Sequence, residues 1–180
     1  NMADTVTKTF GVGGRTITVS VLRALAAAGD YAAEDVLSDS ATDGVGTAIS
    51  FTGIGKSEGA AGYITKASIL CSTTGLTPRL TLFLFNTTPT CELDDNAANT
   101  AVLAADQANY IGHIDFPGME DLGTGMSQTI ATPNTSGNLP LAFNCAADSK
   151  TLYGVLVTRD AIAGEAAGMT VRINLTTEWE

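Results

Sequence analysis

Apolar and polar positions alternate in several short segments of the chain. In segment 170–176, Val171, Ile173 and Leu175 fall on one side, and threonine, arginine and asparagine fall on the other. Segment 47–52 alternates in the same way. A period of two is typical of a β-strand that buries one face. Both segments are therefore predicted to be strands with one wet face.

A third alternating segment, 110–116, contains the single histidine of the chain. His113 and Asp115 are predicted to lie on its polar side, opposite the larger apolar side chains, which are Tyr110, Ile114 and Phe116. Segments 80–85 and 152–157 are apolar on both sides, as expected of central strands that are covered above and below. These two segments should form the middle of the core.

Further strands are predicted at 62–71 and 139–144, and a weaker one at 16–22. Glycine and proline turn signals separate the segments. About eight short strands at this spacing predict an all-β fold, a single β-sandwich of jelly-roll type.

Two segments depart from the strand pattern. Asp94, Asp95 and Asn96 precede an alanine-rich run, and residues of these types cap helices, so a short helix is predicted over 97–108. In segment 21–28, helix and strand compete and the pattern does not decide between them.

The first thirty residues differ in composition from the rest, and Gly29-Asp30 marks a boundary. Residues 1–29 are interpreted as an N-terminal arm and residues 30–180 as the β-sandwich domain. Such an arm can add a strand to a neighbour's sheet while its apolar side chains fill pockets there; these candidate interface residues are Phe10, Ile17, Val19 and Leu22. The alternative is an ordinary first strand with a frayed terminus.

The net charge of the chain argues against two classes of binding partner. Nineteen acidic and nine basic side chains give a net charge of −10, which repels both a phosphate backbone and an anionic membrane. Nucleic acid and membranes are therefore not expected partners. The longest apolar runs, 21–28 and 80–85, are shorter than a membrane-spanning helix, and the first ten residues hold no apolar signal core.

The motifs for phosphate binding are incomplete. Gly55-Lys56-Ser57 resembles the end of a phosphate-binding loop, but Ser50 stands where that loop needs its first glycine, and the residues after Ser57 predict a turn instead of a helix. Segment 53–57 is better interpreted as a glycine-rich connection between strands.

No set of residues predicts catalysis or metal binding. Cys71, Cys91 and Cys145 lie far apart in the sequence, so they are expected to be buried small hydrophobic residues, and neither a zinc site nor a cofactor is predicted. His113 would be the conventional general base, but the sequence contains no Gly-x-Ser-x-Gly nucleophile motif that it could activate. The adjacent carboxylates are interpreted as hydrated surface charge; these pairs are Glu34-Asp35, Asp94-Asp95 and Glu120-Asp121. We therefore expect a protein that is not an enzyme.

Several segments together resemble one protein family. They are Tyr31 to Leu37, Ala61 to Cys71, Leu80 to Pro89, Asp94 to Ala98, Tyr110 to Ile114 and Thr151 to Arg159. In this pattern, over about residues 31–180, the chain is similar to the small virion proteins of tailed bacteriophages that act as head decoration or cement proteins. Residues 1–30 depart from the family pattern.

The resemblance implies a β-sandwich that forms a symmetric dimer or trimer on the outer surface of the capsid. There it would bind the major capsid protein and clip neighbouring capsomers together, through several weak contacts at once. Tyr31 and Trp179 are candidate interface residues of the domain, although Trp179 would equally serve as a cap of the core. A tail, neck or head-fibre protein and a carbohydrate-binding module are the alternatives.

Overall fold

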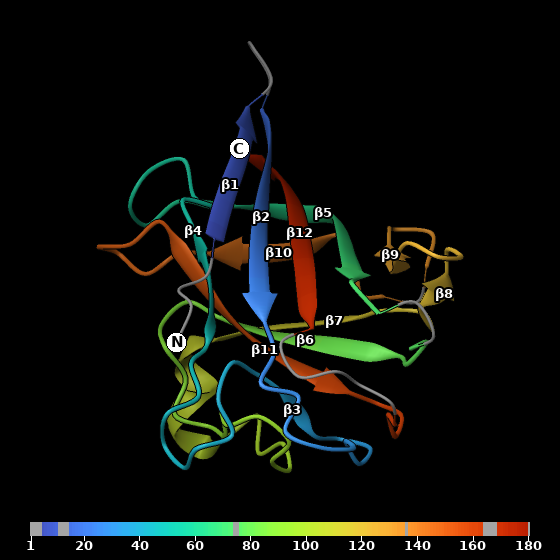
Figure 1. Cartoon of the computed structure of the whole chain (residues 1–180). Helices are drawn as coiled ribbons and strands as arrows, with labels where there is room; N and C mark the ends of the chain where they lie inside the picture. Colours follow the sequence, from blue (N-terminus) through green and yellow to red (C-terminus); the bar gives the residue numbers. More distant parts are fainter. Residues whose placement is uncertain (1–4, 11–14, 74–75, 136, 164–168, 180) are drawn as a thin grey trace.

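The computed structural model describes residues 5–10, 15–73, 76–135, 137–163 and 169–179, and it is a β-sandwich. Two antiparallel sheets pack face to face, and the broader sheet faces the viewer in Figure 1. The prediction of an all-β sandwich is confirmed. Within the described residues there are twelve strands, and two of them are only two residues long.

The first sheet has seven strands, ordered β1-β2-β12-β5-β9-β8, with β10 also pairing with β5. The strands are β1 (Thr5–Phe10), β2 (Thr16–Ala24), β12 (Thr170–Trp179), β5 (Ala61–Cys71), β9 (Ser127–Ala131), β8 (Glu120–Asp121) and β10 (Leu141–Asn144). Because β2 and β5 flank the C-terminal strand β12, the two ends of the chain meet in one sheet.

The second sheet has five strands, ordered β3-β11-β6-β7, with β4 also pairing with β11. The strands are β3 (Val36–Leu37), β11 (Thr151–Thr158), β6 (Leu80–Phe85), β7 (Tyr110–Asp115) and β4 (Ile49–Thr52). Every residue of β6 is buried, which confirms its prediction as a central strand.

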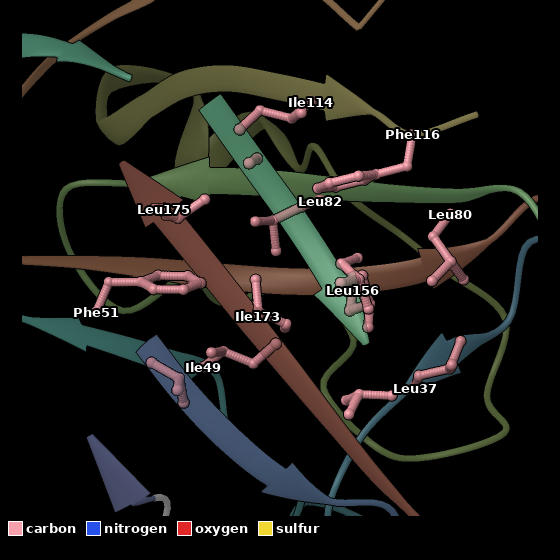
Figure 2. Packing of buried hydrophobic residues seen from close by; sticks show 14 of the residues in the cluster. Leu37, Ile49, Phe51, Leu80, Leu82, Ile114, Phe116, Leu156, Ile173 and Leu175 are labelled. Atoms are coloured by element: carbon pink, nitrogen blue, oxygen red, sulfur yellow. The ribbon is translucent and has the colours of Figure 1, made fainter. Parts of the chain in front are cut away.

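The main core lies between the sheets and is made by the inward-pointing positions of the alternating strands. Ile173 from β12 packs toward Ile49, Phe51 and Leu156 of the second sheet (Figure 2). These side chains are at most 1% exposed. The period-two pattern of the sequence therefore predicted the buried face of β4 and β12 correctly.

A second apolar cluster covers the other face of the five-stranded sheet; its buried members are Val36, Phe83, Phe85, Cys91, Val155 and Val157. Segment 86–109 lies over this cluster and contributes Leu93, Ala101 and Val102. The segment is mostly irregular, and only Ala104–Asn109 forms a 3₁₀ helix, η1. The predicted helix over 97–108 was wrong in extent, because Asp94 and Asp95 use their carboxylates on other backbone groups instead of capping a helix.

The alternation predicted in 110–116 is interrupted by a bulge. The register shifts between Leu84 and Phe85, so Tyr110 pairs with Phe85 while Gly112 pairs with Leu84. One extra residue turns Tyr110 onto the face of His113, where their side chains are hydrogen-bonded. Ile111 joins the main core in its place.

Residues 16–24 form β2 between β1 and β12, so this part of the predicted arm is a sheet strand. Ile17 and Val19 point into the main core of their own chain and are 1% and 0% exposed. For residues 16–24, the interpretation as part of a separate arm is therefore corrected to the alternative of a strand of the domain, while residues 1–4 and 11–14 of the predicted arm lie outside the described residues. The uncertain segment 21–28 begins as strand. The physical reason is that the apolar side chains at alternate positions of β2 point inward, and they are buried only when β2 is part of the sheet.

Candidate functional site

The candidate site is the outer face of the seven-stranded sheet. Its side chains belong to the strand positions that alternate with the core positions, and those of β2 and β12 are half-buried or exposed. In Figure 1 these two strands are seen from this side, and no helix of the described chain lies in front of them. A broad sheet face of this kind is a surface on which a partner can pack.

The register aligns the outward side chains in rows that cross the sheet. One row contains Thr5, Leu22, Arg172, Leu70, Gln128 and Glu120. The next contains Thr7, Ser20, Asn174, Ser68 and Ile130. Farther along β12, Thr176 aligns with Thr18 and Lys66, and Glu178 aligns with Thr16 and Tyr63.

Small hydroxyl and amide side chains occupy the centre of this face. The Thr18 and Thr176 hydroxyl oxygens lie 3.0 Å apart, and Asn174 donates from Nδ2 to the Ser68 hydroxyl at 3.1 Å. Arg172 donates from one guanidinium nitrogen to the Ser20 hydroxyl at 3.1 Å. The serine, threonine and asparagine side chains are short and hydrogen-bonded to their neighbours, so a partner can approach the centre of the face closely.

The outer edge of β1 is open. β1 pairs with β2 and stands at the end of the sheet, and among the described residues no other strand pairs with it. An open edge presents unpaired backbone N–H and C=O groups to which an extended segment of a neighbour can add. At the opposite end of the sheet, β8 is only two residues long and acidic, features that discourage such pairing.

A charged groove lies at one end of the second sheet. Its volume is about 360 Å³ and it is lined by Glu34, Arg79, Leu80, Thr81, Asp115, Phe116 and Arg159. Arg159 pairs with Glu34 and donates from Nε to the Thr81 hydroxyl at 2.8 Å. Arg79 pairs with Asp160 and lowers the pKa of that carboxyl to about 2. Both arginines thus have acidic partners within the chain.

His113 lies beside this groove and is held by two neighbours. Its Nδ1 atom lies 2.9 Å from the Tyr110 hydroxyl, and its Nε2 atom lies 3.4 Å from a carboxylate oxygen of Asp115. Asp115 also accepts the hydroxyl of Thr81 at 2.7 Å. The partly exposed histidine therefore belongs to a polar surface network, as its predicted position on the polar side of the strand suggested.

Asp94 and Asp95 are buried, so their interpretation as hydrated surface charge was wrong. Asp94 accepts backbone N–H groups of Gly46 and Gly44 at 2.7 Å each, and these bonds lower its pKa. Asp95 accepts the Ser38 N–H at 2.7 Å and the Tyr31 hydroxyl at 2.9 Å, while its burial raises its pKa. Both carboxylates hold loops in place.

The predicted interface residues fall into different environments. Tyr31 is 2% exposed, and its hydroxyl is hydrogen-bonded to Asp95 in the interior of the chain. Its prediction as an interface residue is therefore corrected, because the side chain is part of the core. Trp179 packs against the main core and donates from Nε1 to the Ile54 carbonyl at 2.9 Å, which favours its reading as a cap. Leu22 lies on the outer face of the sheet, and Phe10 lies in β1 opposite Ile17.

The three cysteines are free and buried, as predicted. Burial, followed by the nearby Asp106 charge, raises the pKa of Cys91 to about 11, and burial raises the pKa of Cys145. Segment 53–57 lies in the connection between β4 and β5, in agreement with the sequence interpretation. Within the described ranges, no three histidine, cysteine, aspartate or glutamate side chains gather as a metal site would require.

The same described residues contain no helix that is both long and apolar enough to span a membrane. Comparison of the chain with family models, curated proteins and solved structures finds no match.

Proposed function

We propose that this protein is a structural component of a virion, a decoration protein that binds the outer surface of a bacteriophage head and clips neighbouring capsomers together. Its partner is the major capsid protein, and it acts by binding alone. The family resemblance of residues 31–180 supports this role, and a tail, neck or head-fibre location is the alternative.

The open edge of β1, beside the broad polar face of its sheet, is the observation that carries the proposal. A clip has to bind more than one neighbour, and a strand edge and a sheet face are two separate binding surfaces on one small domain, so the edge can bind the head while the face binds another protein chain. The net charge of −10 supports the role as well, since an acidic exterior keeps a densely covered particle soluble.

The experiment compares particles with and without the protein. We expect it to co-purify with heads, to lie on the outer surface in electron micrographs, and to raise the temperature at which heads release their contents. A position at the tail or neck would replace the decoration role by the alternative. A protein absent from particles, with head stability unchanged, would refute the proposal.

Proline variants test whether the β1 edge contributes to the contact with the head. Successive N–H groups of a strand alternate between its two sides, so proline at Val6 and proline at Thr7 remove donors on opposite sides of β1. One variant should lose a bond to β2 and unfold more easily. The other should remain as stable as the wild type and bind heads less tightly. Equal binding by both variants would exclude the edge as the contact.

A further inference from the structure

We infer that the outer face of the seven-stranded sheet is the contact between two copies of this chain, related by a two-fold axis that lies between the two packed sheets and runs perpendicular to the strands, level with the middle of β12. The inference specifies the dimer within the proposed function and rests on it for biological meaning. The occupant of the face is thus a second copy, packed sheet to sheet.

Self-complementarity of charge is the first argument. Arg172 and Glu178 are outward residues of the same strand, six positions apart, with outward Asn174 and Thr176 between them. A two-fold axis across β12 at position 175 reverses the direction of the strand, so Arg172 of one copy lies opposite Glu178 of the other. The axis creates this pair twice, which is the property of an isologous interface.

The neighbouring strands match under the same operation. On β5, Leu70 stands in the row of Arg172 and Tyr63 in the row of Glu178, so each Leu70 lies opposite a Tyr63. Tyr63 is 41% exposed, one of the larger apolar side chains that the fold leaves uncovered. On β2, Ser20 lies opposite Thr18, both short hydroxyl side chains. Apolar pairs toward one side and small polar residues at the centre allow two twisted sheets to pack about 10 Å apart.

The charge balance of the face is the second argument. A molecule with a net charge of −10 repels its own copies. The rows described above carry two basic residues, Lys66 and Arg172, and two acidic ones, Glu120 and Glu178. This face is therefore neutral within an acidic molecule, which makes it a surface where a second copy can approach without net repulsion.

Charge exchange tests the geometry. The variants Arg172→Glu and Glu178→Arg each place like charges opposite one another twice, so each alone should dissociate at least about tenfold more readily than the wild type. An equimolar mixture of the two variants, and the double variant R172E/E178R, both restore opposite charges at the two contacts. Sedimentation velocity from about 1 to 100 μM should show weakened dimers for the single variants, with recovery in the mixture and in the double variant.

Lys150→Glu is the matched control, since it makes the same change of charge at an exposed residue outside the sheet face. It should dimerise like the wild type. A wild-type chain that stays monomeric at about 100 μM, or a mixture no more dimeric than its components, would overturn the inference. Sedimentation uses the isolated protein without virions, so it tests the dimer separately from the proposed function. A monomeric protein that binds heads would refute the dimer inference alone. A dimeric protein that binds no heads would refute the proposed function alone.

Discussion

The hydroxyl of Tyr31 donates a hydrogen bond to Oδ1 of Asp95 at 2.9 Å, in the interior of the protein. The same carboxylate accepts the backbone N–H of Ser38, and Asp95 is 3% exposed. Asp95 does not cap a helix. Its carboxylate links segment 86–109 to the residues on either side of β3, and because the carboxylate is buried, the strength of this link depends on pH.

Asp95→Asn should change the pH dependence of stability in a defined direction. Because burial raises the folded-state pKa of Asp95, its proton-linked contribution is present below the unfolded pKa of about 3.9 and is lost as pH rises through the folded value. The stability advantage of the wild type over the variant should therefore shrink as pH rises. Urea unfolding between pH 4 and 8 measures it, with exposed Asp43→Asn as the control. An advantage that grows with pH would contradict the prediction.

Asp94→Asn should show the opposite trend. The N–H groups of Gly46 and Gly44 lower the pKa of Asp94, so its contribution is present above the unfolded pKa and is lost as pH falls through the folded value. The wild type should lose its advantage over this variant under acidic conditions. The same unfolding series extended to pH 2 tests this, and a difference that is constant with pH would show that the carboxylate is not held by its charge.

Gly46→Ala should destabilise the loop that Asp94 holds. A Cβ atom at position 46 would lie 2.0 Å from the Leu93 carbonyl oxygen, so the backbone has to move and the bond to Asp94 stretches. We expect a loss of about 2–4 kcal/mol in the free energy of unfolding. Gly125→Ala is the matched control, because its Cβ would meet no atom within 4 Å, and it should change stability by less than about 1 kcal/mol. Equal effects would contradict the close contact.

The strands that could be predicted from sequence are those whose inward positions are apolar. β4, β6, β11 and β12 were found for this reason. β9 was missed because two of its inward residues, Ser127 and Thr129, are polar yet buried. Their hydroxyl groups donate to the carbonyls of Thr73 and Pro117, and such distant partners leave no sign in a local pattern.

Two further features depend on tertiary contacts. The bulge that turns Tyr110 toward His113 is a property of strand pairing, so simple alternation assigned the wrong face. The candidate dimer face could not be predicted for a related reason. Leu22, Leu70 and Arg172 lie far apart in the sequence, and only the strand register aligns them in one row. The buried side of β12 could be predicted from its apolar alternation, but the neighbours of its outer side depend on the strand register.

The thiols should be unreactive in the folded protein. All three cysteines are buried, and the pKa of Cys91 is raised to about 11, so little thiolate is present at pH 8. Ellman's reagent should label none of them within minutes under native conditions and all of them in guanidinium chloride. Fast labelling of one thiol in the native state would show that the loops over it open, and Cys→Ser variants would identify the site.

Arg23→Met should be the most destabilising of these substitutions. Arg23 is 2% exposed on the inward side of β2, and its guanidinium donates to the carbonyls of Thr47 and Ala48, which lead into β4. It also lies 3.5 Å from Asp39, and although burial alone would raise the pKa of Asp39, the N–H of Thr47 and the charge of Arg23 lower it. Methionine keeps the apolar stem but leaves the two carbonyls without the guanidinium donor and removes the positive charge beside Asp39, at a cost of about 3–5 kcal/mol. Exposed Arg15→Met is the control, and guanidinium unfolding followed by the fluorescence of the single tryptophan is the measurement. A loss below about 1 kcal/mol would mean that water replaces the guanidinium and that Arg23 does not join the sheets.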